Sequence, residues 1–386
     1  MKIGVPAEID GGESRVAATP ETIKKFLAFG ASVSVQTGAG LASRITDADY
    51  EAAGATIAPD AAAAVADADV VLKVRRPLEA ELPAYKRGAL VIATMDPYGH
   101  EAAVDAMGAA GITAMAMEFM PRITRAQVMD VLSSQANLAG YQAVIDAAST
   151  YDRALPMMMT AAGTVPAARV FVMGAGVAGL QAIATARRLG AVVTATDVRP
   201  AAKEQVESLG AKFVAVEDEE FKQAETAAGY AKPMSAEYQA KQAALVAEHI
   251  KKQDIVITTA LIPGRAAPRL VTAAMVASMR PGAVLVDLAV ERGGNVEGSR
   301  PGEIVDIEGR RIVGYLNVAG RIPATASQLY AKNLSSFLET LVDKTAKALA
   351  VNYEDELVRA TVLTRDGAVV HPAFKPKIVA ADEGSL

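Results

Sequence analysis

The chain has 386 residues, of which 51% are hydrophobic and 22% are charged, and its formal net charge is -5 at pH 7. A chain of this length is expected to form two domains with separate cores, and its interspersed charges exclude the basic surface that nucleic acids require. The absence of cysteine excludes disulfides, thiolate metal sites and cysteine nucleophiles, and it is typical of a reducing compartment such as the cytosol.

The sequence predicts neither a membrane span nor a metal site. Residues 1–6 lack the basic flank and apolar stretch of a signal peptide and are predicted to form a strand. The most apolar window, residues 170–186, is shorter than the roughly 20 residues of a span and contains three glycines. His100, His249 and His371 show no pairing typical of a metal site or a catalytic dyad.

One unit recurs along the chain: a helical stretch ends in a small residue and glycine, and a run of β-forming residues follows at once. It occurs at Gly30, Gly54, Gly111, Gly190 and Gly210. Glycine supplies the left-handed residue that ends a helix, and the following strand packs back on a sheet. Alternation of helix and strand predicts an α/β fold with parallel sheets.

Both halves of the chain also carry an apolar strand that begins at Asp and ends at Pro, residues 69–77 and 254–263. We therefore expect two Rossmann-like, doubly wound parallel-sheet domains. Helical spacing of apolar residues predicts long linking helices over residues 133–151 and 324–351. The predicted domains are residues 1–135 with 325–386, which form a discontinuous N-terminal Rossmann-like domain, and residues 136–324, which form the second Rossmann-like domain.

The end of the chain predicts a β-hairpin. Residues 361–370 alternate around Asp366-Gly367, a strong turn signal. Such a hairpin is either an oligomer contact or an ordinary edge hairpin, and the sequence favours neither.

The second domain contains a dinucleotide-binding fingerprint. The apolar strand 169–173 runs into Gly174, Gly176 and Gly179 and then into a helix over residues 180–189. The first glycine makes the tight turn, the second admits the pyrophosphate close to the backbone, and the third lets helix and strand pack closely. The phosphates then lie at the positive helix N-terminus.

The strand 191–197 ends in Asp197, about 20 residues after the glycines, where a carboxylate accepts hydrogen bonds from the adenosine ribose. Asp197 repels a 2'-phosphate, so we expect NAD(H) rather than NADP(H). Arg199 either receives a 2'-phosphate or, as we favour, stacks on adenine or is solvated. Asp287 ends a later strand and is interpreted as a hydrogen-bonded strand-end acid rather than a catalytic one.

Several long segments resemble the NAD(H)-binding subunit (the first portion of the alpha subunit, domain I) of the proton-translocating nicotinamide nucleotide transhydrogenase. They are residues 13–20, 158–164, 174–179, 196–200, 261–265 and 287–295. The likeness covers almost the whole chain. Alanine dehydrogenase shares the same pattern.

The resemblance implies functional residues. Its cofactor-binding positions are Gly174, Gly176, Val177, Gly179, Asp197, Val198, Arg199, Gly229, Tyr230 and Leu261. Its catalytic positions, which place the nicotinamide and its ribose, are Arg122, Gln127, Asp130 and Ser133; the sequence alone is equally consistent with a helix cap and solvated charges at these residues. Residues 217–238 are long for a connection and rich in Gly, Pro and charge; they are similar to a family loop that closes over NAD(H), the alternative being a passive insertion.

A missing proton donor separates the two family activities. In alanine dehydrogenase an Arg, a Lys and a His hold and protonate the keto acid; here Arg15 and Lys73 match, but residues 90–96 contain no His. Reduction of a ketone or imine needs a proton, whereas hydride transfer between two nicotinamide rings does not. Arg15 and Lys73 are then relics of a common pocket or serve the fold.

The resemblance therefore implies a peripheral transhydrogenase subunit that binds NAD(H) and exchanges hydride with NADP(H) on a partner subunit. It implies a membrane-spanning subunit, a homodimer and a location on the cytoplasmic face of the inner membrane. Two alternatives stay open: an alanine dehydrogenase-like oxidoreductase and a non-catalytic NAD-sensing module.

Overall fold

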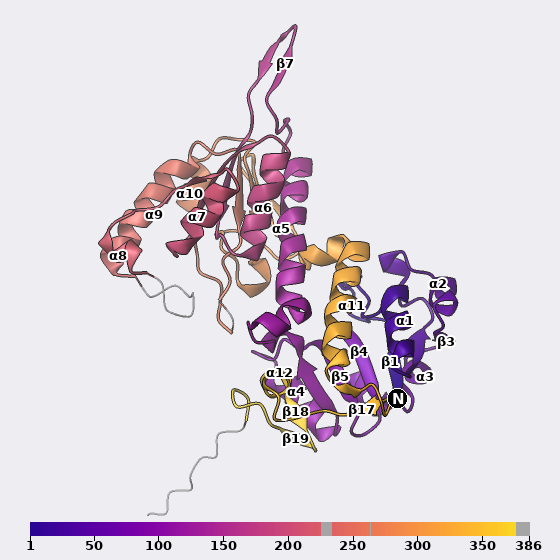
Figure 1. Cartoon of the computed structure of the whole chain (residues 1–386). Helices are drawn as coiled ribbons and strands as arrows, with labels where there is room; N and C mark the ends of the chain where they lie inside the picture. Colours follow the sequence, from indigo (N-terminus) through magenta and orange to yellow (C-terminus); the bar gives the residue numbers. More distant parts are fainter. Residues whose placement is uncertain (225–233, 263, 376–386) are drawn as a thin grey trace, which may run out of the picture. The chain divides into compact units, whose positions relative to one another are not determined.

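The computed structural model describes residues 1–224, 234–262 and 264–375. The chain divides into two compact units, Met1–Ser134 with Ile322–Leu386 (unit 1) and Gln135–Arg321 (unit 2). Each unit is built around its own parallel sheet (Figure 1). No helix within the described residues is both long enough and apolar enough to cross a membrane.

Unit 1 contains a six-stranded parallel sheet in the order β3-β2-β1-β4-β5-β6. The strands are β1 Lys2–Val5, β2 Ser32–Gln36, β3 Thr56–Ala58, β4 Val70–Arg75, β5 Leu90–Thr94 and β6 Thr113–Ala116. Its α-helices are α1 Pro20–Ala28, α2 Asp47–Ala52, α3 Ala61–Val65, α4 Glu101–Ala109, α11 Pro323–Glu339 and α12 Glu356–Thr361, and its 3-10 helices include η2 Glu79–Ala84 and η4 Thr124–Met129.

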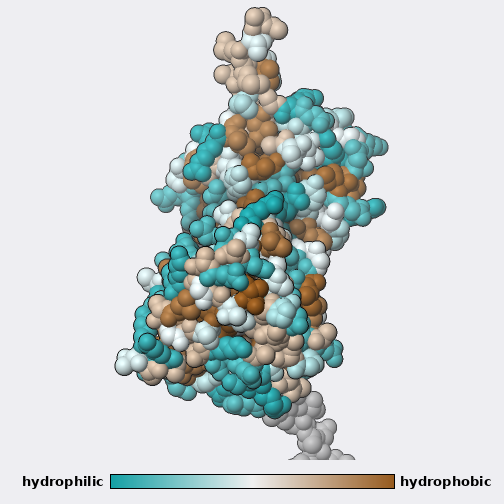
Figure 2. Space-filling view, turned by 90° about the vertical axis from the view of Figure 1, so that its right-hand side faces the viewer, coloured by the Kyte–Doolittle hydropathy of each residue, from teal (hydrophilic) through white to brown (hydrophobic). Residues whose placement is uncertain are grey.

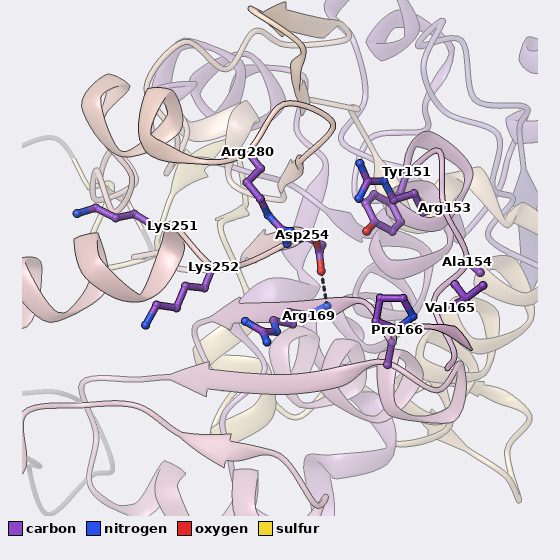
Figure 3. A pocket seen from close by; sticks show the side chains of 11 residues that line it. Tyr151, Arg153, Ala154, Val165, Pro166, Arg169, Lys251, Lys252, Asp254 and Arg280 are labelled. Atoms are coloured by element: carbon purple, nitrogen blue, oxygen red, sulfur yellow. Dashed lines mark hydrogen bonds and ion pairs between the residues drawn. The ribbon is translucent and has the colours of Figure 1, made fainter. Parts of the chain in front are cut away.

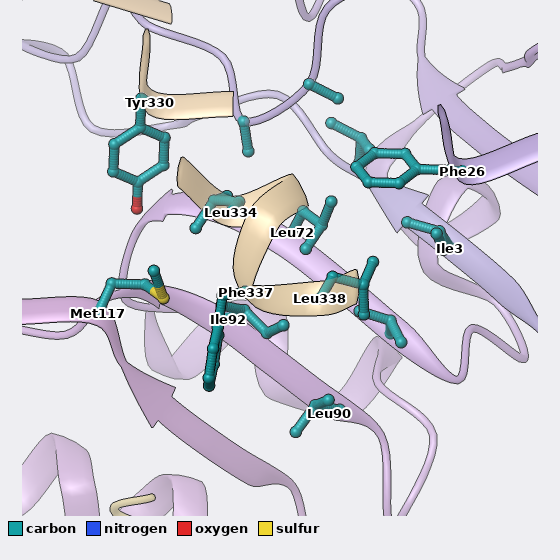
Figure 4. Packing of buried hydrophobic residues seen from close by; sticks show 14 of the residues in the cluster. Ile3, Phe26, Leu72, Leu90, Ile92, Met117, Tyr330, Leu334, Phe337 and Leu338 are labelled. Carbon is teal, nitrogen blue, oxygen red and sulfur yellow. The ribbon is translucent and has the colours of Figure 1, made fainter. Parts of the chain in front are cut away.

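Helices cover both faces of this sheet. On one face, Leu334, Phe337 and Leu338 of α11 pack with Leu72 and Ile92 of the strands, and α1 adds to the same fully buried cluster (Figure 4). On the other face α3 and α4 form a second apolar cluster with β4, β5 and β6. A parallel sheet needs this cover, because its strands are apolar on both faces.

Unit 2 contains a seven-stranded sheet in the order β11-β10-β9-β12-β13-β15-β14. The strands are β9 Arg169–Met173, β10 Val192–Thr196, β11 Lys212–Phe213, β12 Ile255–Thr258, β13 Val284–Asp287, β14 Ile304–Ile307 and β15 Arg310–Val313. Only β14 runs antiparallel to its neighbour among the described strands of this sheet. The helices are α5 Val131–Thr150, which starts before the unit boundary, α6 Val177–Arg188, α7 Ala201–Ser208, α8 Glu219–Lys222, α9 Ala236–Ile250 and α10 Ala273–Ser278.

Unit 2 has three layers. Helices α5, α6 and α7 share an apolar cluster with one face of the sheet, and α9 and α10 share another with the opposite face. Helices α5 and α6 lie side by side (Figure 1). A Cβ placed on Gly140 of α5 would lie 2.0 Å from the carbonyl oxygen of Ala178 in α6, so the two helix backbones touch there.

These observations confirm the predicted fold class. The five glycines expected to end helices all have φ between 74° and 99°, and a strand follows each of them. The C-terminal hairpin is present as β18 Thr364–Arg365 and β19 Ala368–Val369. Its turn residues Asp366 and Gly367 have φ of 53° and 84°, which are the two positive values of a tight hairpin turn.

One predicted helix boundary is wrong. The helix expected over residues 324–351 ends at Glu339, and the chain continues as a hairpin of β16 Val342–Asp343 and β17 Ala348–Leu349. Leu341 is fully buried and Val342 packs against the same cluster as α11. Apolar residues after the helix therefore still face the core, which extends the helical spacing past the true end.

A further hairpin, β7 Met158–Thr160 and β8 Gly163–Val165, was not predicted from the sequence. It projects from the rest of unit 2 (Figure 1). Met157 and Met159 are 61% and 79% exposed, and the projecting tip is coloured largely tan and brown in Figure 2. Three-residue strands without a Gly-containing turn at the usual place carry too weak a pattern to predict.

Gly140→Ala is expected to destabilise the protein, because the new methyl group meets backbone that cannot move aside. We expect a loss of roughly 1–3 kcal/mol in the free energy of unfolding, as for other overpacked sites. Gly108→Ala in α4 is the matched control: its nearest neighbour lies at an ordinary 3.5 Å, so a gain of up to about 1 kcal/mol is expected. Urea denaturation followed by circular dichroism measures both, and equal stability of Gly140→Ala and wild type would refute the packing argument.

Candidate nucleotide-binding site

The predicted glycine turn lies at the point where the strand order of unit 2 reverses. β9 is flanked by β10 on one side and by β12 on the other. From its carboxyl end β9 connects to β10, whereas β12 connects to β13 in the opposite direction, so the order reverses between β9 and β12. Ligands of doubly wound sheets bind in the crevice at this position. Gly174 follows β9 directly, and Gly176 caps the N-terminus of α6.

The three glycines of the turn differ in what requires them. Gly174 has a φ of 106°, which disfavours any side chain. A Cβ on Gly179 would lie 1.8 Å from the carbonyl oxygen of Gly174, so close packing of α6 on β9 requires glycine there. Gly176 has an ordinary φ of -76°, and a Cβ there would meet no described atom within 4 Å. The described residues therefore give no packing reason for glycine at position 176.

Asp197 lies immediately after β10 and beside the turn. Its side chain is 7% exposed. Its Oδ2 accepts a hydrogen bond of 2.8 Å from the amide of Ala175, and its two oxygens accept further bonds from Arg199. The carboxylate is therefore held at the glycine turn, where the ribose of a dinucleotide is expected.

Buried Asn295, the last residue of the similar segment 287–295 and one for which the sequence predicts no role, holds the next segment of the site. The Asn295 side chain donates from Nδ2 to the carbonyls of Ala260 (2.9 Å) and Pro268 (2.8 Å), and its Oδ1 accepts from the amide of Ala260 (3.0 Å). These three bonds tie both ends of the loop that carries Leu261. Leu261 is 53% exposed, and the predicted cofactor contacts Val177 and Val198 are 42% and 46% exposed.

Asp287 in turn holds Asn295. The carboxylate is 1% exposed and accepts hydrogen bonds of 3.0–3.1 Å from the amides of Ala289, Asn295 and Val296. These three amides lie in the segment that follows β13, and the Thr258 hydroxyl of β12 adds a bond of 3.4 Å to Oδ1. This supports the interpretation of Asp287 as a strand-end acid that shapes a loop.

The other group of predicted residues lies in unit 1, where η4 leads into α5. Asp130 precedes α5, and its carboxylate accepts from the Ser133 amide (2.9 Å) and hydroxyl (2.5 Å), which is an N-terminal cap. Arg122 and Gln127 are exposed. The structure thus brings Asp130 and Ser133 into contact, while Gly229 and Tyr230 lie outside the described residues.

Unit 1 has its own strand-order reversal, between β1 and β4, and ion pairs occupy it. A pocket of about 150 Å³ lies there, lined by Lys73, Glu8 and Glu81 among others. Lys73 is 1% exposed, and its Nζ lies 2.7 Å from Glu81 and 3.4 Å from Glu8. Burial raises the pKa of Glu8, and the neighbouring Lys73 charge partly offsets this.

Arg15 is held in the same way. Glu13 has a fully buried side chain that pairs with Arg15 at 2.7 Å and with Arg75 at 2.8 Å. Burial alone would raise the pKa of Glu13, but the hydrogen bond and charge of Arg15 and the charge of Arg75 outweigh it and lower the pKa to about 2. Both cations that match a keto-acid site are therefore already paired with internal carboxylates.

A larger pocket of about 420 Å³ lies elsewhere in unit 2, at the amino ends of β9 and β12 (Figure 3). At its centre Asp254 accepts from the Arg169 amide (2.8 Å) and pairs with Arg280 (2.6 Å). Lys252 and Arg280 closely follow the C-termini of α9 and α10, where cations offset the negative helix end. This pocket is at the end of the strands opposite the glycine turn and is not the nucleotide site.

Comparison with known proteins identifies the family. The profile of the alanine dehydrogenase/PNT N-terminal domain matches residues 4–139, and that of the alanine dehydrogenase/PNT C-terminal domain matches residues 143–372. The chain belongs to this family. The resemblance inferred from the sequence motifs is thereby confirmed, and the chain is a dehydrogenase-type, nucleotide-binding member of the alanine dehydrogenase/PNT family.

Similar relatives carry the transhydrogenase name. The chain is 57% identical over 379 residues to the first portion of the NAD(P) transhydrogenase subunit alpha of Rhodospirillum rubrum, covering 97% of this chain and 99% of the relative. Among solved structures, transhydrogenase from Sinorhizobium meliloti matches with a TM-score of 0.88 and 66% identity over 96% of this chain and 100% of that one. An L-alanine dehydrogenase matches with a TM-score of 0.82 and 26% identity over 97% and 98%.

Asn295→Ala is expected to release the loop between Ala260 and Pro268, because it leaves two carbonyls and one amide without their partner. Trypsin should then cut after Arg265, within this loop, several times faster than in wild type, and the free energy of unfolding should fall by about 1–3 kcal/mol. Asn352→Ala is the control, since exposed Asn352 makes a local side-chain bond to the Glu354 amide. Equal cleavage of wild type and Asn295→Ala would contradict the assigned role.

Proposed function

We propose that this chain binds NAD(H) at the glycine turn of unit 2 and passes hydride directly between NADH and NADP+ held by a separate subunit. The observation that carries the proposal is the contrast between the two strand-order reversals. In unit 2 the space above Gly176 is open to a ligand. In unit 1 Lys73 already forms ion pairs with the buried carboxylates of Glu8 and Glu81.

The chemistry follows from this contrast. An amino-acid dehydrogenase must hold a carboxylate with a cation and supply a proton with the hydride. Here Arg15 and Lys73 already pair with glutamates, and the matching strand has no His. Transfer between two nicotinamide rings needs only that the rings be close and correctly oriented, and such positioning can supply much of the rate.

In the proposed complex the pyrophosphate lies over Gly176 at the N-terminus of α6, and the adenosine ribose binds Asp197. Val177, Val198 and Leu261 offer exposed apolar contacts. Gly174 and Gly179 follow from the glycine fingerprint, and Arg199 lies beside the ribose position through its ion pair with Asp197. The remaining cofactor positions, Gly229 and Tyr230, and the nicotinamide positions, Arg122, Gln127, Asp130 and Ser133, are assigned by family resemblance. Gly174 and Gly179 act through the shape of the turn.

The partners in this proposal are an NADP(H)-binding subunit and a membrane-spanning subunit, with the chain on the cytoplasmic face of the inner membrane. The relatives are named as alpha subunits, and this chain covers 73% of the NAD(P) transhydrogenase subunit alpha of Cereibacter sphaeroides, which is therefore longer. We also propose a homodimer, for which the exposed methionines of the β7–β8 hairpin are a candidate contact.

Two assays separate this function from its alternatives. With the NADP(H)-binding subunit added, the chain should catalyse reduction of NADP+ by NADH; alone with L-alanine and NAD+ it should form no NADH. Robust alanine oxidation would establish the alanine dehydrogenase function instead. NADH binding without any transfer in the complete assembly would favour an NAD-sensing module.

Gly176→Ala should fold normally and bind NADH at least about tenfold more weakly, because its methyl group enters the space assigned to the pyrophosphate. Gly179→Ala should instead lower the thermal midpoint, because its methyl group meets the Gly174 carbonyl. Equilibrium dialysis with NADH and thermal denaturation measure the two effects. Unchanged NADH affinity in Gly176→Ala would refute the placement of the pyrophosphate.

Arg122→Ala and Gln127→Ala should slow hydride transfer by roughly 10- to 100-fold, because a small displacement of the ring is costly, while changing NADH affinity much less. Arg125→Ala is the control: this neighbouring arginine of η4 pairs with Asp355 and Glu356 and should leave transfer unchanged. Equal losses in transfer rate and NADH affinity would mean that Arg122 and Gln127 only hold the nucleotide.

A further inference from the structure

The Asp197 carboxylate has all its acceptor positions filled by its own chain. Oδ1 accepts from the amide and the Nε of Arg199, both at 2.9 Å, and Oδ2 accepts from the Ala175 amide at 2.8 Å and from Nη2 of Arg199 at 3.0 Å. A carboxylate offers about four lone-pair sites. A ribose cannot bind to Asp197 until one of these donors leaves.

The four donors are not equally easy to remove. The amides of Ala175 and Arg199 belong to the backbone of the turn and of the segment after β10, so they are fixed by the fold. The other two bonds come from the guanidinium of Arg199. It lies at the end of a long aliphatic side chain that is 30% exposed, so it can move away. A ribose diol brings two hydroxyl donors, the same number that the guanidinium supplies.

We propose that Arg199 is an internal competitor for the ribose subsite, which occupies Asp197 in the free protein and is displaced when NAD(H) binds. This inference rests on the proposed NAD(H) site. The bidentate pair keeps the nearly buried carboxylate hydrogen-bonded while no nucleotide is present. It also weakens NAD(H) binding, because only molecules in which the guanidinium has moved away are competent to bind.

The proposal predicts the sign of a substitution. Arg199→Met keeps an unbranched side chain but removes the two guanidinium bonds, so NADH should bind about 1.5- to 5-fold more tightly, the range expected for breaking a partly exposed ion pair. The gain should appear as faster association with unchanged dissociation, because the competent fraction rises. Arg199→Lys keeps the charge but not the bidentate fork and should lie between wild type and Arg199→Met.

Stopped-flow titration of NADH into wild type and the Arg199 variants measures both rate constants, with thermal denaturation as a check on folding. Weaker binding with faster dissociation in Arg199→Met would show that Arg199 is a direct nucleotide contact and would overturn the proposal, as would unchanged affinity. The Asp197→Ala variant tests separately whether Asp197 binds the ribose at all, which the competitor role requires. If that variant binds NADH like wild type, the ribose assignment is wrong and the competitor role falls with it.

Discussion

The close approach of α6 to the end of β9 is the constraint on which the rest of unit 2 depends. A side chain at Gly179 would overlap the Gly174 carbonyl. Because residue 179 is glycine, the N-terminus of α6 can lie at the strand-order reversal. The same turn presents the Ala175 amide to Asp197, and the Thr259 hydroxyl donates to the Gly174 carbonyl at 3.1 Å. Two hydrogen bonds between side chains and the backbone thus tie Asp197 and the start of the 259–268 loop to the same turn.

The sheets of the two units share the order of five strands but differ in what lies at the strand-order reversal. In unit 2 the space beside Gly176 at the reversal is open, whereas in unit 1 the corresponding position contains the Lys73, Glu8 and Glu81 ion pairs. Removing one partner from such a buried set is costly, because it leaves an uncompensated charge. The ion pairs are therefore structural in unit 1, which is why the proposed nucleotide site is assigned to unit 2.

Features set by short-range rules could be predicted from the sequence. The helix-ending glycines, the strands after them, the glycine turn and Asp197 all follow from local conformation and spacing, and the family resemblance followed from the segments around them. Features set by distant contacts could not. The role of Asn295 depends on carbonyls 35 and 27 residues away, the partners of Lys73 are not marked by any spacing, and α11 ends earlier than its apolar pattern because a hairpin continues that pattern into the core.

The central claim is that hydride passes directly from NADH on this chain to NADP+ on another subunit. The most direct test is to supply NADH deuterated at C4 on the transferred face, NADP+ and the NADP(H)-binding subunit in ordinary water. The account predicts that the NADPH formed carries the deuterium at C4, because no solvent proton enters the transfer. NADPH with hydrogen from water at that position, or no NADPH at all, would contradict it.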